Sequence, residues 1–292
     1  MRTIQIDYPI SKSIQTDSER CVMALGFFDG VHLGHQKIIK TAKKLADEKN
    51  LMLAVMTFSQ HPSSVIKKGK VITNYITPLS EKTEVFEQLG VDLLYVIDFT
   101  KEVAKIPHDQ FVDDYLCGLN CEHVVAGFDY KYGFKGKGDM EQLPIDSAGR
   151  FGVTTAAKLE KHEQKVSSTL LRELISSGRV EQIQEYLGRS YEISAEMKGR
   201  GRTCTIYFDP DYYLPCPGHY EVTIIRKNML QSKGICEVKS VQHPGQLQVT
   251  LFNDQLFNDH AKVQLQWNNF IADFEMDAFH AQSDFRELEM SI

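Results

Sequence analysis

Residues 1–187 alternate short apolar runs with stretches that carry the hydrophobic period of an amphipathic helix. The apolar runs fall at 21–25, 51–58, 91–99, 122–128 and 152–159, and helical patterns follow the first three of them, at 36–49, 78–89 and 108–119. This alternation favours a parallel sheet, because two parallel strands need a long crossover connection that is usually a helix. We therefore expect an α/β domain whose ligands bind beyond the carboxyl ends of the strands.

The pattern changes near residue 188. Six short strand-like runs follow, separated in part by turns at residues 215–218 and 244–245, and a helical pattern covers 277–290. The runs are 192–197, 203–208, 219–226, 234–241, 247–252 and 262–267. Several short strands with turn residues between them predict an antiparallel β-barrel. We expect two domains, 1–187 and 188–292.

Composition limits the classes of function. The 292 residues are 42% hydrophobic and 25% charged, contain no apolar run long enough for a membrane span, and show no signal-peptide pattern at the N-terminus. A net charge of −6 argues against a general nucleic-acid binder. We expect a cytoplasmic protein with reduced cysteines that binds small molecules, has no nucleic-acid or membrane partner, and is a monomer or a weak homo-oligomer.

The stretch at residues 25–35 joins the first apolar run to the first helical pattern. It reads Leu25-Gly26-Phe27-Phe28-Asp29-Gly30-Val31-His32-Leu33-Gly34-His35. The first N–H groups of a helix are unpaired and the helix dipole is positive there, so a strand-to-helix junction suits an anion. Glycines let the backbone approach a ligand, and imidazoles can donate hydrogen bonds to a phosphate. We interpret the stretch as a nucleotide-binding loop.

Two other interpretations of the histidine pair stay open at this point. Two histidines three residues apart could bind zinc, but a zinc site needs further ligands nearby, and the candidates His61 and His123 could join the pair only by distant folding. The pair could also consist of ordinary turn residues. The three glycines and the strand-to-helix context favour the nucleotide loop.

The same stretch resembles the histidine signature of prokaryotic FAD synthetases, which belong to the nucleotidyltransferase superfamily with its His-x-Gly-His motif. The family's commonest form has Asn at the position of Phe27. The resemblance implies a Rossmann-like nucleotidyltransferase sheet in residues 1–187, with His32 and His35 as catalytic residues. It also implies ATP contacts from Gly26, Phe27, Phe28, Asp29 and Gly34.

A second motif, Ser167-Ser168-Thr169-Leu170-Leu171-Arg172, opens another helical pattern. One hydroxyl residue suffices to cap a helix, so capping leaves the other two and Arg172 without an explanation. The set resembles the superfamily's Ser-Ser-Thr-x-x-Arg signature. By that resemblance Ser167, Ser168 and Thr169 bind ATP and Arg172 is catalytic, together holding the triphosphate opposite the histidines.

Two further loops follow predicted strands. The segment Thr57-Phe58-Ser59-Gln60-His61-Pro62 resembles the family's Thr-Phe-x-Pro-His-Pro, with Gln60 in place of a proline, and implies FMN contacts from His61 and Pro62. The lysine- and glycine-rich loop at 127–139 resembles Gly-Glu-Asp-Phe-x-Phe-Gly, with Phe128 in place of Glu. It implies that Asp129 contacts the nucleotide or neighbours magnesium. Each segment also fits an ordinary exposed loop.

By position, the second domain resembles the riboflavin kinase barrel of the bifunctional family. Residues 198–202 are similar to the kinase's entry sequence and 217–220 to its Pro-x-Gly-Val-Tyr strand. The Gly-x-Pro-Thr-Ala-Asn signature that should follow is absent, and the chain reads Thr203-Cys204-Thr205-Ile206-Tyr207-Phe208 instead. A kinase needs a metal clamp and a positioned base. We expect a barrel without kinase activity that serves a structural, flavin-binding or regulatory role.

The resemblance implies transfer of AMP from ATP to FMN, giving FAD and pyrophosphate, with Mg²⁺ bound to ATP and no all-protein metal site. Two alternatives stay open. The chain could be a bifunctional riboflavin kinase and FAD synthetase, or a non-catalytic regulator that senses flavin or nucleotide and binds RNA or protein through its barrel. Residues 188–292 carry 14 acidic and 10 basic residues, which argues against RNA.

Overall fold

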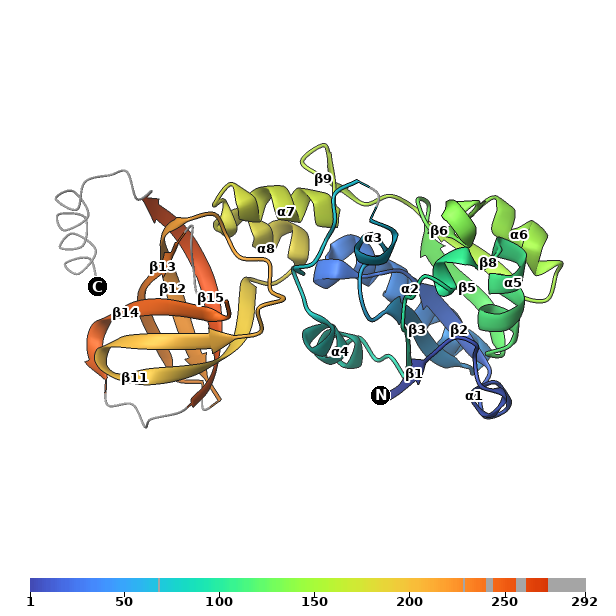
Figure 1. The fold of residues 1–292 in the computed structure, drawn as a ribbon, viewed down its shortest axis with the longest axis horizontal. Helices are drawn as coiled ribbons and strands as arrows, with labels where there is room; N and C mark the ends of the chain where they lie inside the picture. The colour runs from blue at the N-terminus through green and yellow to red at the C-terminus, as the bar shows by residue number, and fades with distance from the viewer. Residues whose placement is uncertain (68, 228, 240–243, 256–260, 273–292) are drawn as a thin grey trace. The chain divides into compact units, whose positions relative to one another are not determined.

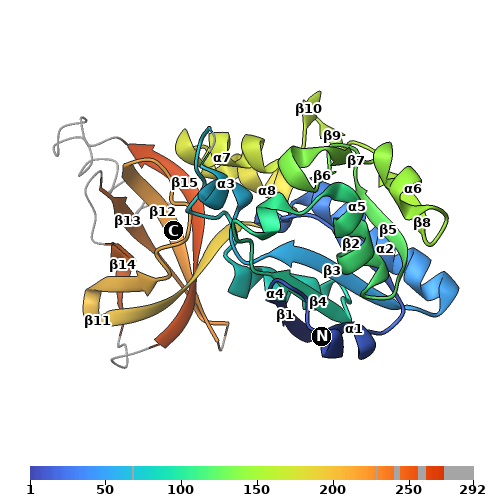
Figure 2. The same cartoon turned by 45° about the vertical axis from the view of Figure 1, so that its right-hand side comes forward.

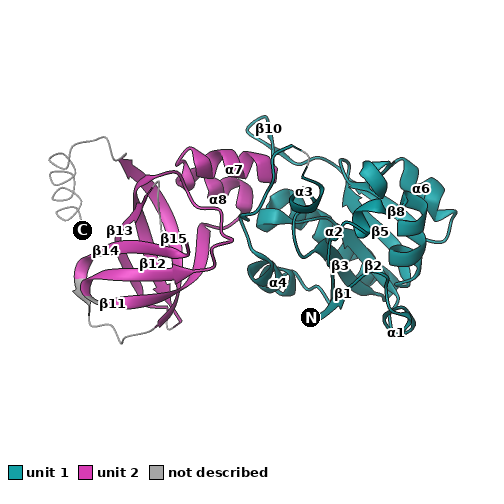
Figure 3. Cartoon of the chain, in the orientation of Figure 1, with its two compact units in different colours: residues 1–166 teal, residues 167–292 magenta. Residues whose placement is uncertain are grey.

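The computed structural model describes residues 1–67, 69–227, 229–239, 244–255 and 261–272. The chain divides into two compact units, Met1–Val166 and Ser167–Ile292 (Figure 3). The helical segment after Val166 groups with the barrel by its contacts, whereas the expected functional boundary lies at residues 187 and 188. That functional boundary stays a prediction. The predicted helix at 277–290 lies outside the described residues.

Unit 1 is built on a six-stranded sheet in the order β1-β4-β3-β2-β5-β8, in which every neighbouring pair is parallel. The strands are β1 (Arg2–Ile6), β2 (Cys21–Leu25), β3 (Met52–Phe58), β4 (Leu93–Ile97), β5 (Cys121–Gly127) and β8 (Gly152–Ala156). The five runs predicted as strands are present, and β2 has the predicted bounds. β1 was not predicted. Its five residues lie at the edge of the sheet and are mostly exposed, so they lack the apolar run that marked the other strands.

Helices cover both faces of this sheet (Figures 1 and 2). One core contains buried residues of α2 (Leu33–Lys49) and α4 (Leu79–Gln88). The other contains residues of α5 (His108–Phe111), the π-helical turn η3 (Val112–Cys117) and α6 (Gln142–Ser147). The remaining elements of unit 1 are short: α1 (Lys12–Thr16), η1 (Asp29–Val31), α3 (Pro62–Ile66), η2 (Val103–Lys105), β6 (Lys131–Tyr132), η4 (Phe134–Gly136), β7 (Gly138–Asp139), β9 (Glu160–Lys161) and β10 (Gln164–Lys165).

The strand order reverses at β2. From β2 the chain proceeds through β3 to β4 on one side, whereas β5 and β8 pair on the other side. In sheets of this kind the ligand site lies at the carboxyl ends of the strands where the order reverses. The segments after β2 and β5 therefore meet at this edge, and they are the histidine loop and the loop that contains Asp129.

Unit 2 begins with α7 (Ser168–Ser176), η5 (Val180–Gln182) and α8 (Ile183–Leu187) and continues into a closed barrel with the order β11-β14-β13-β12-β15. Its strands are β11 (Tyr191–Phe208), β12 (Gly218–Arg226), β13 (Gln231–Val238), β14 (Gln246–Gln255) and β15 (Ala261–Ala272). The first half of β11 pairs with β15 and its second half with β14, so two predicted runs form one long strand. The predicted fold class, a parallel α/β sheet followed by an antiparallel barrel, is confirmed.

Candidate active site

The histidine loop begins after β2 at Gly26 and turns so that the Phe28 ring packs against Gly26. A Cβ at Gly26 would lie 2.9 Å from the Phe28 ring, so only glycine fits this close approach. Phe28 is buried and adopts a left-handed conformation (φ 58°), and its ring meets the rings of His35 and Phe86 edge-on. The sequence thereby folds the loop into a compact turn that presents its histidines at the start of α2.

His32 and His35 lie at the first turn of α2. His32 is only 4% exposed, and its Nδ1 accepts a hydrogen bond from the His35 backbone N–H at 3.2 Å, which makes it the helix N-cap. The two rings stack with their centroids 3.5 Å apart. Because Nδ1 of His32 is an acceptor, the neutral ring carries its proton on Nε2, which leaves Nε2–H as the donor for a ligand.

Burial and positive neighbours keep both imidazoles neutral. Desolvation, helped by Lys165, lowers the pKa of His32 to about 4. Desolvation, followed by the charges of His32, Lys82 and Lys165, holds the pKa of His35 well below its ordinary value. Nδ1 of His35 is buried and has no hydrogen-bond partner among the residues that the structure describes. A buried polar atom without a partner is costly, so this one calls for an explanation, and a catalytic role is one.

The neutral state of His32 makes the fold sensitive to acid. The unfolded chain binds a proton at this residue below about pH 6.5, whereas the native protein does so only near pH 4, so stability is complete above pH 6.5 and is lost as the pH falls towards 4. Between pH 7 and pH 5 this site should lower the free energy of unfolding by about 2 kcal/mol. Asn caps helices well but does not titrate. Urea denaturation should therefore show His32→Asn losing about 2 kcal/mol less than the wild type over that range.

The exposed His162 offers the matched control for this measurement. His162→Asn should follow the wild-type pH dependence, because the change lies in the β9–β10 hairpin and leaves the His32 ring and its surroundings as they are. Equal acid sensitivity in His32→Asn and the wild type would show that His32 is not the group responsible.

Phe27 is the second residue after β2, and its carbonyl accepts two hydrogen bonds. Thr57 Oγ1 and Lys82 Nζ both donate to it, each at 3.0 Å. Lys82 Nζ also lies 4.2 Å from the centroid of the Phe27 ring. Lys82 is 2% exposed, and desolvation lowers its pKa to about 8 although Asp29 raises it. A buried ammonium group therefore holds the backbone of the histidine loop at Phe27.

Asp29 is buried in the same loop, where its Oδ1 accepts a hydrogen bond from the Thr77 backbone N–H at 3.2 Å. This contact ties the loop to the segment before α4. Sequence reasoning missed Lys82 and Thr77. A signal for Lys82 was present, because it occupies the buried face of the helical pattern with Leu79 and Phe86, three and four residues away.

His61 and Pro62 follow β3, beside the histidine loop. His61 is the N-cap of α3, with its Nδ1 accepting from the Ser63 N–H at 3.1 Å, and its ring meets the Phe27 ring edge-on with centroids 4.8 Å apart. The structure therefore brings the β3 loop to the β2 loop. His123, the other residue considered for zinc, lies inside β5 with its Nε2 2.8 Å from Thr154 Oγ1. Within the described ranges, no three His, Cys, Asp or Glu side chains are grouped to hold a metal.

Asp129 follows β5 and carries an exposed carboxylate that accepts a hydrogen bond from Lys165. Nζ of Lys165 also lies 4.7 Å from the centroid of the Phe128 ring. A Cβ at Gly34 would lie 3.4 Å from the Val166 carbonyl oxygen and 3.1 Å from the His32 ring. The segment that ends in Lys165 and Val166 therefore passes the start of α2, close to both the β2 and the β5 loops.

The hydroxyl motif begins α7 in unit 2. Ser167 is the N-cap and its Oγ accepts from the Leu170 N–H at 3.2 Å, so capping uses one hydroxyl of the three. Leu171, Leu174 and Ile175 are buried, as the helical pattern predicted. Arg172 lies over the ring of Tyr213, with its Cζ 4.6 Å from the ring centroid.

A strand-to-helix loop with glycines and two neutral histidines, at the point where a parallel sheet reverses its strand order, defines a nucleotide-binding α/β protein. Comparison with known proteins identifies the family. A family profile described as FAD synthetase matches residues 14–170. The chain therefore belongs to the FAD synthetase family and is a nucleotidyltransferase, which confirms the assignment made from the histidine signature.

Individual relatives agree with this assignment. The chain is 39% identical over 285 residues to a bifunctional riboflavin kinase/FMN adenylyltransferase of Bacillus subtilis, covering 91% of this chain and 89% of that protein. It is 32% identical over 210 residues to a FAD synthetase of Listeria monocytogenes, covering 70% of this chain and 82% of that protein. A solved structure titled macrolide-efflux protein, from Streptococcus pneumoniae, has a TM-score of 0.85 and 24% identity, covering 99% of this chain and 98% of that one. The last likeness concerns the fold alone. No helix among the described residues is long and apolar enough to cross a membrane.

Proposed function

We propose that the protein transfers AMP from ATP to FMN, with the histidine loop as the catalytic centre. The observation that carries the proposal is the stacked pair His32 and His35 at the start of α2, in which the buried Nδ1 of His35 has no partner in the described part of the chain. The FMN phosphate is itself an anionic nucleophile, so the reaction needs positioning and charge stabilisation rather than a covalent protein group.

The bond changes are simple. An oxygen of the FMN phosphate forms a bond to the α-phosphorus of ATP, the bond from that phosphorus to the bridging oxygen breaks, and pyrophosphate leaves. His32 and His35 donate hydrogen bonds to the α-phosphate as its charge grows. Gly26, Phe27, Phe28, Asp29 and Gly34 form the backbone of the ATP loop, and Lys82 supports it from below.

Further residues complete the proposed site. Ser167, Ser168, Thr169 and Arg172 hold the β- and γ-phosphates, which is supported by their position at the start of α7 and by the likeness of the segment to the Ser-Ser-Thr-x-x-Arg signature. His61 and Pro62 contact FMN, supported by the packing of His61 against Phe27. Magnesium takes one or two carboxylates together with phosphate oxygens, and the exposed carboxylate of Asp129 fits that demand. The ion would neutralise phosphate charge there.

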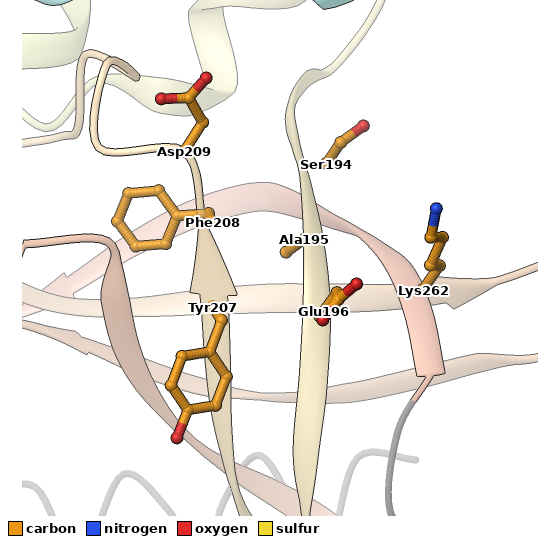
Figure 4. Close-up of a pocket in the computed structure, with 7 residues that line it drawn as sticks. All are labelled: Ser194, Ala195, Glu196, Tyr207, Phe208, Asp209 and Lys262. Atoms are coloured by element: carbon orange, nitrogen blue, oxygen red, sulfur yellow. The ribbon is translucent and has the colours of Figure 1, made fainter.

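We also propose that the barrel lacks kinase activity. Two of the residues that replace the kinase signature, Tyr207 and Phe208, line a pocket of about 380 Å³ in unit 2, together with Ser194, Ala195, Glu196, Asp209 and Lys262 (Figure 4). The lining includes two carboxylates and one ammonium group. A polyphosphate would meet a net negative charge in this pocket, which disfavours ATP.

One assay tests both proposals. Chromatography of the products should show FAD and pyrophosphate after incubation with FMN and Mg-ATP, and neither FMN nor FAD after incubation with riboflavin and Mg-ATP. Formation of FMN or FAD from riboflavin would establish the bifunctional alternative. Binding of FMN or ATP without pyrophosphate release would identify a flavin-sensing regulator and refute the catalytic proposal.

A further inference from the structure

The side chain of Arg172 connects the phosphate motif of α7 to the barrel. Its guanidinium lies over the ring of Tyr213, with Cζ 4.6 Å from the ring centroid. This distance is within the range of an attractive cation–π contact. Both residues belong to unit 2, and Tyr213 lies in the segment between β11 and β12. Tyr213, from the barrel unit, therefore provides an aromatic contact for Arg172, the arginine of the Ser-Ser-Thr-x-x-Arg motif.

Two buried tyrosines fix the segment that presents Tyr213. The hydroxyl of Tyr191, which is 1% exposed, donates a hydrogen bond to the Tyr213 carbonyl. The hydroxyl of the neighbouring Tyr212, which is also buried, accepts a hydrogen bond from the Ser194 N–H at 3.1 Å. Both anchors are tied to the first half of β11. The position of the Tyr213 ring is thus set by the barrel strands rather than by the loop itself.

The helix is fixed against the same barrel at its other end. Gly178, two residues past α7, adopts a φ of +75°, and a Cβ there would lie 3.3 Å from Cys216 Sγ, from a Phe270 ring carbon and from the Tyr220 hydroxyl. A larger residue would have to displace these barrel side chains. Since α7 and the Tyr213 segment both rest on the barrel, the distance between Arg172 and Tyr213 is set by packed elements.

Stacking suits an arginine that binds phosphate. A contact with an aromatic ring uses none of the guanidinium's N–H groups, which form a planar fork that fits phosphate oxygens. Holding the fork in one orientation before ATP arrives reduces the rotamer entropy lost on binding. A barrel without kinase activity would thus still contribute to adenylyl transfer, because it orients an arginine that binds ATP.

We propose that Tyr213 is a positioning residue that orients Arg172 for the ATP phosphates. The inference rests on the proposed role of Arg172 in phosphate binding. It assigns the barrel a part in adenylyl transfer that is independent of flavin binding or kinase activity.

The test measures steady-state kinetics of FAD formation in the full-length chain. Tyr213→Leu removes the ring face, and we expect the KM for ATP to rise about 3- to 30-fold, with kcat and the KM for FMN little changed. Tyr213→Phe keeps the ring and should retain wild-type values. Tyr207→Leu, a change at an exposed tyrosine of β11, is the matched control and should also leave them unchanged.

A double variant separates this inference from the function on which it rests. If Tyr213 acts through Arg172, adding Tyr213→Leu to Arg172→Gln should raise the KM for ATP no further than Arg172→Gln alone. An unchanged KM in Arg172→Gln would refute the role of Arg172. An impaired Arg172→Gln beside a normal Tyr213→Leu would overturn only the positioning role. A Tyr213→Leu protein with a lower melting temperature and both KM values raised would also overturn it, since the ring would then be merely structural.

Discussion

Replacing His35 by alanine is expected to lower the rate of FAD formation by a factor of about 100 to 1,000 while the fold survives. A positioned donor that stabilises developing charge contributes about 3–4 kcal/mol to the transition state. The His35 ring stacks on His32 at 3.5 Å and meets Phe28 edge-on, and its Nδ1 has no partner among the described residues, so the change breaks no hydrogen bond at that atom. Product chromatography gives the rate, and circular dichroism shows whether the fold persists.

Two further variants sharpen the His35 experiment. His35→Gln keeps an N–H donor on a flexible side chain, so its rate should fall between those of the wild type and His35→Ala. His162→Ala removes an exposed histidine of the β9–β10 hairpin and should retain the full rate. Near-normal turnover by a folded His35→Ala protein would refute the assignment of this residue as catalytic.

The fold could be predicted from sequence where local pattern and tertiary burial agree. The run at residues 21–25 is apolar throughout and became β2, whose five residues are all buried between two strands. The carboxyl edge of the sheet could be predicted for the same reason, since each motif followed such a run. β1 could not be predicted, because its few buried atoms depend on parallel pairing with β4, about 90 residues away in sequence.

The chemistry of the site was only partly predictable. The sequence placed His32 and His35 at a helix start, but their neutrality follows from burial beneath a loop that turns back on Gly26, which no spacing reveals. The aromatic ring beside Arg172, that of Tyr213, is 41 residues away in sequence and comes from a different element, so the helical pattern gave no indication of it. Lys82 was overlooked because lysine is almost never fully buried.

Lys82 is a costly residue for the fold. Burial lowers its pKa from 10.5 to about 8, so the native protein holds the protonated amine less well than the unfolded chain does. Below pH 8 this difference opposes folding by about 3 kcal/mol, and it vanishes as the pH rises through 10.5. A lysine that destabilises the fold at neutral pH, and that also holds the Phe27 carbonyl at 3.0 Å, is better explained by function than by stability.

Replacing Lys82 by methionine is therefore expected to have opposite effects on stability and activity. Met fills a similar apolar volume without the charge, so urea denaturation at pH 7 should show a gain of up to about 3 kcal/mol, which should shrink as the pH approaches 10. FAD formation should fall about 10- to 100-fold, because the Phe27 carbonyl loses a charged hydrogen-bond donor and the histidine loop loses a nearby positive charge.

The exposed Lys40 on α2 supplies the control, and Lys40→Met should change neither quantity by much. Loss of both stability and activity in Lys82→Met would show that the ammonium group is a structural support whose contacts with Phe27 and Asp29 outweigh its desolvation. A stabilised protein with full activity would show that the charge beneath the loop has no part in catalysis. A Lys82→Met protein that is more stable but forms FAD more slowly than the wild type would support a lysine that is retained for catalysis at the histidine loop.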